Sequence, residues 1–211
     1  MANEQVQWKR FPLYDYIRYP VAGTTSLSFF NVPLGGTDPV SSAAKTLEQT
    51  NVQKSSQLGY PFVIHQFRLD MRLLPKARQH ATVLALTDYV WDDIGDVAEE
   101  LENLLGQGVL NFKIGQKTYY DVNKPFRYCP AGFGVSITSE AGAADTVHVQ
   151  APASKPYALT PPQYIESDQI ITVSVDFANA TSPALTGLIA SQDARLEVGL
   201  ILDGYAGFAV Q

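Results

Sequence analysis

The segment Ala194-Arg-Leu-Glu-Val-Gly-Leu-Ile-Leu-Asp203 decides the fold, because apolar side chains recur in it at every second position. Ala194, Leu196, Val198, Leu200 and Leu202 form one set, and they alternate with Arg195, Glu197, Gly199, Ile201 and Asp203. Period two is typical of a β-strand that buries one face. A similar pattern runs through residues 165–177. Both segments predict an all-β body in which residues 193–203 form a structural strand.

Further strands are predicted outward from this segment, each bounded by proline, glycine or polar residues. The whole predicted set covers residues 26–32, 62–74, 81–86, 109–114, 117–122, 126–129, 132–138, 165–177 and 193–203. Gly115-Gln116 has the length of a two-residue hairpin turn. The polar stretches 33–60 and 140–160 are predicted to be long loops, and loops of this length are uncommon unless they bind something or move.

The strand 62–74 has an apolar pattern that changes face along its length. Phe62 and Ile64 lie on one face, whereas the other face carries Val63, His65, Phe67, Leu69, Met71 and Leu73. Within such a strand, His65 is interpreted as a core or interface histidine and not as a metal ligand.

One helix is predicted, over residues 92–105, because its apolar side chains form a single stripe at helical spacing. Asp92 or Asp93 suits the start of this helix, and Gly106 suits its end. Six acidic residues and no basic residue lie between Asp92 and Glu102. They are interpreted as a solvated outer face, with a contact for a basic neighbour as the alternative.

Strands that are separated by turns, with no helices alternating between them, favour an antiparallel β-sandwich over a parallel α/β sheet. The best fit is a single jelly roll of about eight strands, with one short inserted helix and two long loops. The predicted organisation is an extended N-terminal arm over residues 1–25 and a jelly-roll domain over residues 26–211.

Composition favours a protein that makes extensive contacts with other proteins. Charged residues form 17% of the chain and aromatic residues 11%, and a charged share of about 25% is usual. Aromatic residues also favour strands, so an ordinary β protein is the alternative. Residues 1–80 have nine basic and five acidic side chains, whereas residues 81–211 have six and sixteen. No basic run indicates specific nucleic-acid recognition.

The sequence contains no catalytic or metal-binding signature. Cys129 is the only cysteine, which excludes an intrachain disulfide and a cysteine-based zinc site. The three histidines, His65, His80 and His148, have no ligand spacing. Glu166 and Asp168 would share one face at the opening of a strand, where solvated side chains are expected. We therefore expect no enzyme activity, no cofactor, no metal and no small-molecule substrate. The alternative is a jelly-roll enzyme, with a nucleophile pair of Cys129 and a histidine brought near it by folding, or with Glu166 and Asp168 in acid–base work or calcium binding.

The predicted arm combines aromatic and basic side chains. Its aromatic residues Trp8, Phe11, Tyr14, Tyr16 and Tyr19 are the candidate interface residues, and Lys9, Arg10 and Arg18 lie among them. Such a mixture suits single-stranded nucleic acid, but Pro12, Pro20 and the alternation equally suit a β arm that lies on a neighbouring subunit. The sequence shows no signal peptide or membrane-spanning run, so synthesis in a cytosol is expected.

Several stretches together resemble the jelly-roll capsid proteins of tailless icosahedral phages, in particular the single-domain kind. They are Arg10-Phe-Pro-Leu-Tyr-Asp-Tyr16, Leu27-Ser-Phe-Phe-Asn-Val-Pro33, Thr50-Asn51, Pro61-Phe-Val-Ile-His-Gln-Phe67, Gly108-Val-Leu-Asn-Phe-Lys-Ile-Gly115 and Leu196-Glu-Val-Gly-Leu-Ile-Leu-Asp-Gly204. The resemblance covers the whole chain and lies in its pattern of strands and loops, without a diagnostic motif. The chain is too short for the sixteen strands of a double jelly roll.

The resemblance implies a capsid subunit of the virion, made in the host cytoplasm, that forms trimeric or pentameric capsomers of an icosahedral shell. Partners would be further copies of the chain and other virion proteins, with weak contact of the basic N-terminal part to the genome or to an internal membrane. The alternative is a carbohydrate- or receptor-binding β-sandwich module of a virion spike.

Overall fold

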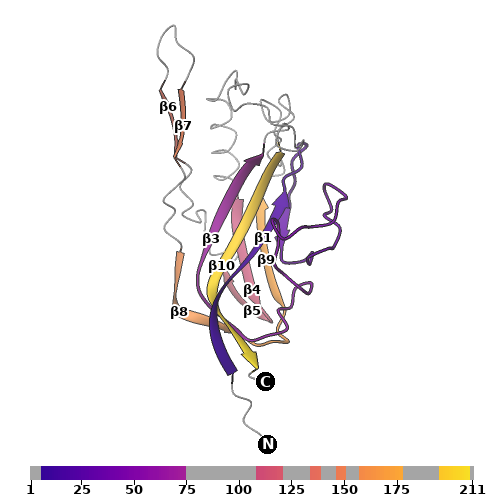
Figure 1. Ribbon diagram of the computed structural model, residues 1–211, viewed down its shortest axis with the longest axis vertical. Helices are drawn as coiled ribbons and strands as arrows, with labels where there is room; N and C mark the ends of the chain where they lie inside the picture. The colour runs from indigo at the N-terminus through magenta and orange to yellow at the C-terminus, as the bar shows by residue number, and fades with distance from the viewer. Residues whose placement is uncertain are drawn as a thin grey trace, which may run out of the picture.

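The computed structural model describes residues 6–74, 108–120, 134–138, 146–150, 157–177 and 195–209 (Figure 1). Every regular element in these ranges is a β-strand, which confirms the predicted all-β class. The strands are β1 (Val6–Arg18), β2 (Ser26–Phe29), β3 (Phe62–Leu74), β4 (Gly108–Ile114), β5 (Lys117–Tyr120), β6 (Gly134–Thr138), β7 (Thr146–Gln150), β8 (Tyr157–Ile165), β9 (Ile171–Phe177) and β10 (Arg195–Ala209). The predicted helix 92–105, the predicted strands 81–86 and 126–129, and Cys129 lie outside the described residues.

Two four-stranded antiparallel sheets form a sandwich, with the strand orders β1-β10-β3-β8 and β2-β9-β4-β5. Strands β6 and β7 pair with each other as a separate two-stranded sheet. Without that hairpin, the first strand pairs with the last, the second with the next to last, and so on inward to β4 with β5. A long hairpin rolled into two sheets has this order, which is that of a jelly roll. The predicted single jelly roll is confirmed.

Strand β10, which contains the alternating segment, lies between β1 and β3 in the first sheet (Figure 1). Its inward side chains Leu196, Val198, Leu200 and Leu202 are at most 3% exposed. Burial of each such side chain contributes about 1.5–3 kcal/mol. Across the sandwich, the ring of Phe67 from β3 stacks on that of Phe112 from β4, with 6.4 Å between their centroids. The two sheets are therefore in direct contact through large apolar side chains.

A β-bulge at His65 explains the change of face in β3. The register with β10 passes from Ile64 opposite Gly204 to Gln66 opposite Asp203, and the register with β8 shifts at the same place. The extra residue turns Phe62, Ile64, Phe67 and Leu69 all toward the core. His65 itself is exposed, so a core position is wrong, whereas its interpretation as an interface histidine stays a prediction. A Cβ on Gly204 would lie 2.0 Å from the carbonyl oxygen of Val63, so this close approach requires glycine.

Strand β1 runs unbroken through Pro12, within the segment that the sequence predicts as an extended arm. The reason is its place at the edge of the sheet. The backbone N–H groups of Tyr14 and Tyr16 point away from β10, and in a strand without register shifts Pro12 has the same orientation. Its missing N–H therefore removes no bond from the β1–β10 ladder. Residues 6–18 of the predicted arm thus form an edge strand of their own chain's sheet.

Two other predictions along the chain differ from the structure. The stretch 140–160, predicted as a loop, contains β7 and the beginning of β8. The run 165–177, predicted as one strand, is divided, because β8 ends at Ile165 and β9 begins at Ile171. Strand β8 is an edge strand, where Pro161 and Pro162 cost no central ladder bond. The predicted β4–β5 hairpin is confirmed, and Gly115 in its turn has a φ of 57°.

Candidate interaction surface

The outer face of the first sheet carries the alternate side chains of β1. Leu13 and Ile17 point into the core, whereas Trp8, Tyr14 and Tyr16 point outward. The outward side chains lie beside their register partners on β10, with Tyr16 opposite Gly199 and Trp8 opposite Gly207. A Cβ on Gly199 would lie 2.3 Å from the Tyr16 ring, and one on Gly207 would lie 3.3 Å from the Trp8 ring. Both rings therefore lie over glycines of the central strand.

Tyr16 is held in place by two charged side chains of β3. Its hydroxyl donates a 2.6 Å hydrogen bond to Asp70 Oδ2, and the guanidinium carbon of Arg72 lies 3.5 Å from the centroid of its ring. Burial, together with the hydrogen bond to Asp70, raises the pKa of the Tyr16 phenol far above its usual value. The phenol therefore stays neutral, and the Tyr16 side chain is only 2% exposed.

A second polar cluster crosses the same face farther along β10. Arg10 Nη2 donates a 2.7 Å hydrogen bond to Asp203 Oδ2, and Gln66 Nε2 donates one of 2.8 Å to the same oxygen. The hydrogen bond from Arg10 is the main reason why the pKa of the Asp203 carboxyl is lowered. A hollow of about 430 Å³ lies here, lined by Arg10, Gln66, Arg68 and Asp203 among others.

An aromatic patch occupies the end of this face where β1 begins and β10 ends. We define it as Val6, Trp8, His65, Tyr164 and Tyr205. Trp8, Tyr164 and Tyr205 are 43%, 52% and 43% exposed. The rings of Trp8 and Tyr164 meet edge to face at 6.4 Å, and those of His65 and Tyr205 at 5.2 Å. Exposed clusters of aromatic side chains are characteristic of interaction sites.

The loop between β2 and β3 covers part of the outer edge of β1. Tyr16 N donates to Gln49 O at 2.7 Å, and Asn51 N donates to Tyr14 O at 3.3 Å. The side chain of Asn51 adds two bonds, because its Oδ1 accepts from Tyr14 N at 3.0 Å and its Nδ2 donates to Pro12 O at 2.7 Å. The edge of β1 from Pro12 to Tyr16 is therefore capped by the protein's own loop.

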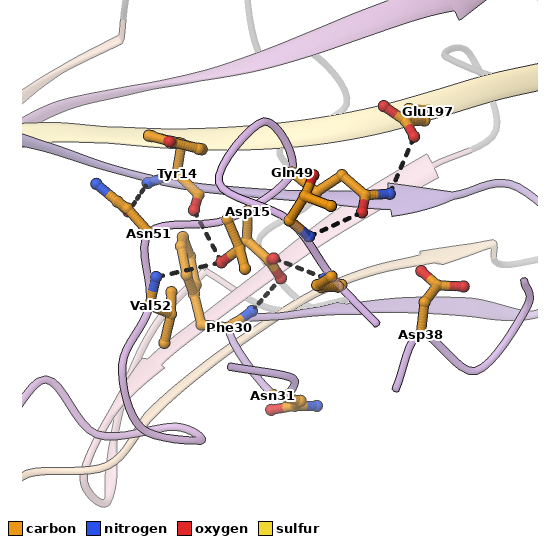
Figure 2. A network of polar contacts seen from close by, with 12 residues as sticks. Tyr14, Asp15, Phe30, Asn31, Asp38, Gln49, Asn51, Val52 and Glu197 are labelled. Carbon is orange, nitrogen blue, oxygen red and sulfur yellow. Dashed lines mark hydrogen bonds and ion pairs between the residues drawn. The ribbon is translucent and has the colours of Figure 1, made fainter. Parts of the chain in front are cut away.

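A buried ion pair ties this loop to β1, and Figure 2 shows the network around it. Lys45 Nζ lies 2.7 Å from Asp15 Oδ1, with both side chains at most 1% exposed. Asp15 Oδ2 accepts a 2.8 Å hydrogen bond from Phe30 N, and Phe30 has a left-handed φ of 63°, which is uncommon for a residue other than glycine. Asp15 thus holds the start of the loop at Phe30 and its middle at Lys45.

The five residues predicted as an assembly arm do not share one surface. Trp8, Tyr14 and Tyr16 lie on the outer face. Phe11 points inward and meets Tyr60 and Phe208 edge to face at 6.0 and 6.4 Å, and Tyr19 is 2% exposed. Burial raises the pKa of the Tyr19 phenol to about 12. Whether any of these residues contacts another subunit stays a prediction.

Glu166 and Asp168 do not share a strand face, so their predicted placement on a strand is wrong, whereas their expected exposure to solvent is confirmed. Both are exposed and lie in the turn between β8 and β9, where Glu166 N donates to Gln169 Oε1. Within the described ranges, no group of three or more His, Cys, Asp or Glu side chains could hold a metal ion. In the same ranges, no helix is long and apolar enough to cross a membrane.

Sequence reasoning missed Tyr164 and Tyr205 of the aromatic patch. Tyr164 follows Pro161-Pro162, where no strand was predicted, and Tyr205 lies beyond the alternating segment. Comparison with known proteins adds no assignment, because no family model, curated protein or solved structure matches the chain.

Proposed function

We propose that the chain is a capsid subunit, a structural protein of a virion whose copies assemble into capsomers of an icosahedral shell. The observation that carries the proposal is the single jelly-roll strand order of the two sheets. Jelly rolls build viral capsids, but they also build lectins and cupins. Fold alone does not decide between these functions, which make different demands on the interior and on the surface of the sandwich.

The interior of the sandwich favours a structural role. A cupin-type or ligand-carrying jelly roll needs space or metal ligands between its sheets. Among the residues that the structure describes, Phe29, Phe67 and Phe112 lie in the core between the sheets, each at most 2% exposed. A core packed with large rings supports a rigid building block better than it supports a binding cavity.

The surface favours contact with other proteins. Four of the exposed large apolar side chains, Val6, Trp8, Tyr164 and Tyr205, belong to the aromatic patch. Aromatic residues are enriched in protein interfaces, and charged residues are depleted from the centres of interfaces. The charged content of 17% agrees with this. Copies of the chain are the proposed partners, in trimeric or pentameric capsomers, together with other virion proteins.

Sedimentation velocity of the purified full-length chain at micromolar concentration tests the proposal. We expect oligomers, and we expect the triple substitution Trp8→Ser, Tyr164→Ser, Tyr205→Ser to weaken association by at least about tenfold, because aromatic anchors carry much of the energy of an interface. Ile170→Ser is the matched control, since Ile170 is 51% exposed but lies outside the patch. A monomer over the whole range would contradict the proposal.

The contact between Trp8 and Tyr164 also favours the second candidate, a carbohydrate- or receptor-binding module of a virion spike. Adjacent exposed rings offer flat apolar surfaces on which a sugar ring can stack. A glycan-binding screen separates the two functions. A spike module would bind a glycan and lose it in the triple variant, while a shell subunit would associate with itself and bind no glycan.

A further inference from the structure

Among the described residues, none caps one part of the edge of the first sheet. The loop between β2 and β3 forms hydrogen bonds with β1 from Pro12 to Tyr16. On the N-terminal side of Pro12, the loop forms no backbone hydrogen bond with β1. Because outward N–H and C=O groups alternate along β1, those of Val6, Trp8 and Arg10 point away from β10. Within the described residues, these groups bond to no backbone partner on that side.

The opposite edge of the sheet is protected in a different way. Strand β8 carries Pro161 and Pro162, and proline cannot donate a hydrogen bond to an added strand. The sheet therefore has one edge blocked by prolines, and another that is half covered by a loop. The open half, Val6 to Arg10, also carries Val6 and Trp8 of the aromatic patch, each more than 40% exposed. An open edge beside exposed apolar side chains suits the addition of another strand.

We propose that residues 6–10 of β1 pair antiparallel with the same residues of a second copy, about a two-fold axis at Trp8. This inference rests on the proposed self-assembly and specifies one of its contacts. The pairing joins the two first sheets into one continuous sheet across the two copies. An icosahedral shell contains two-fold axes, so such a contact would link neighbouring capsomers.

The register follows from hydrogen bonding and charge. With Trp8 opposite Trp8 of the second copy, Val6 faces Arg10, and every outward N–H and C=O of these residues gains a partner. Gln7 then faces Lys9. A two-fold axis at Lys9 would place two lysines opposite each other, and like charges opposite each other destabilise a sheet. A two-fold axis at Arg10 would place Trp8 opposite Pro12, whose missing N–H would leave a hydrogen bond unmade. With the axis at Trp8, Pro12 lies beyond the paired residues, so its missing N–H is not needed.

The side chains leave this edge accessible. Trp8 leans over β10, where its ring lies 3.3 Å from the Cβ position of Gly207. Arg10 is turned toward Asp203, at 2.7 Å, so its charge is already balanced within its own chain. Gln7 and Lys9 are exposed, and both can be substituted without loss of a core contact.

Disulfide crosslinking tests the register directly. Gln7 and Lys9 of the second copy would form a pair without mutual hydrogen bonds, whose Cα atoms are about 4.5 Å apart, within the disulfide range of about 4.4–6.8 Å. The full-length chain would carry Cys129→Ser, which removes its only cysteine, together with Gln7→Cys and Lys9→Cys. Each single cysteine variant is a matched control. We expect a covalent dimer under mild oxidation in the double variant and much less in either single variant.

Three outcomes would overturn the inference. Equal crosslinking of the single variants would show that the register is wrong. Absence of a covalent dimer, while the parent protein still assembles in sedimentation, would contradict this contact and leave the proposed function intact. Absence of the covalent dimer together with absence of assembly in sedimentation would contradict both this contact and the proposed capsid function.

A charge pair provides a second measurement. Gln7→Glu would face Lys9 with opposite charge, and Gln7→Lys would face it with like charge. We expect the dissociation constant to fall roughly several-fold for Gln7→Glu and to rise by a similar factor for Gln7→Lys. Equal effects of the two substitutions would contradict the register.

Discussion

At the scale of single residues, the buried ion pair of Asp15 and Lys45 holds the long polar loop against β1. The two residues lie thirty positions apart, and neither belongs to a motif, so the pair could not be predicted from the sequence. The polarity of residues 33–60 predicted a binding or mobile loop. The structure shows a loop that is held to β1 by an ion pair and hydrogen bonds, and a binding role for it stays a prediction.

Lys45→Met should lower the free energy of unfolding by about 3–5 kcal/mol, because it leaves the buried Asp15 carboxylate without its partner. Urea denaturation measures the change. Lys54→Met, at an exposed position of the same loop, should change stability by less than about 0.5 kcal/mol. Addition of Asp15→Asn to Lys45→Met should recover part of the loss, since Asn still accepts the hydrogen bond from Phe30. A loss as small as that of Lys54→Met would show that the pair does not stabilise the fold.

Asp203 should make stability depend on pH below about pH 5. Its carboxyl has a lowered pKa in the folded state, below the value of about 3.9 in an unfolded chain. The stabilisation is therefore complete above the unfolded pKa and is lost as the pH falls through the folded pKa. Because Arg10 is largely exposed, we expect at most about 1 kcal/mol. The difference in unfolding free energy between wild type and Asp203→Asn should be constant from pH 7 to 5 and shrink toward pH 3. A difference that grows on acidification would contradict this account.

At the scale of elements, strands that bury one face were predicted well. The alternation in β10, β9 and the β4–β5 hairpin is a direct consequence of one face being buried in the sandwich. Strand β8 was missed because an edge position tolerates the prolines that argue against a strand. The face change in β3 was visible in the sequence, but its cause, the bulge at His65, depends on pairing with β10 and β8.

The hydrogen bonds from the loop should protect the edge of β1 from hydrogen exchange and from aggregation. Asn51→Ala removes the hydrogen bonds to Tyr14 N and Pro12 O, and each is worth about 1 kcal/mol. We expect faster amide hydrogen exchange at Tyr14 and Tyr16, and a greater tendency to aggregate through the exposed edge. Exchange at Leu200 in the central strand should follow only global unfolding. Unchanged exchange at Tyr14 would show that the loop does not protect the edge.

At the scale of the whole molecule, the jelly roll was predictable from the number and spacing of the strands. Few topologies can bury the apolar faces of so many amphipathic strands without covering helices. The interaction surface was predictable only in part. Trp8, Tyr14 and Tyr16 of the predicted set share the outer face, but Phe11 and Tyr19 are needed by the core. The other rings of the aromatic patch, His65, Tyr164 and Tyr205, come from β3, β8 and β10, which meet β1 only in the folded sheet.

Electron microscopy of the purified full-length chain at micromolar concentration tests the central claim most directly. If the jelly roll is a shell subunit, the images should show closed shells or uniform ring-shaped capsomers, and the triple substitution in the aromatic patch should remove them without unfolding the domain. Fields of single small particles at every concentration and salt condition, from a protein with an intact β-sheet circular dichroism spectrum, would contradict the account.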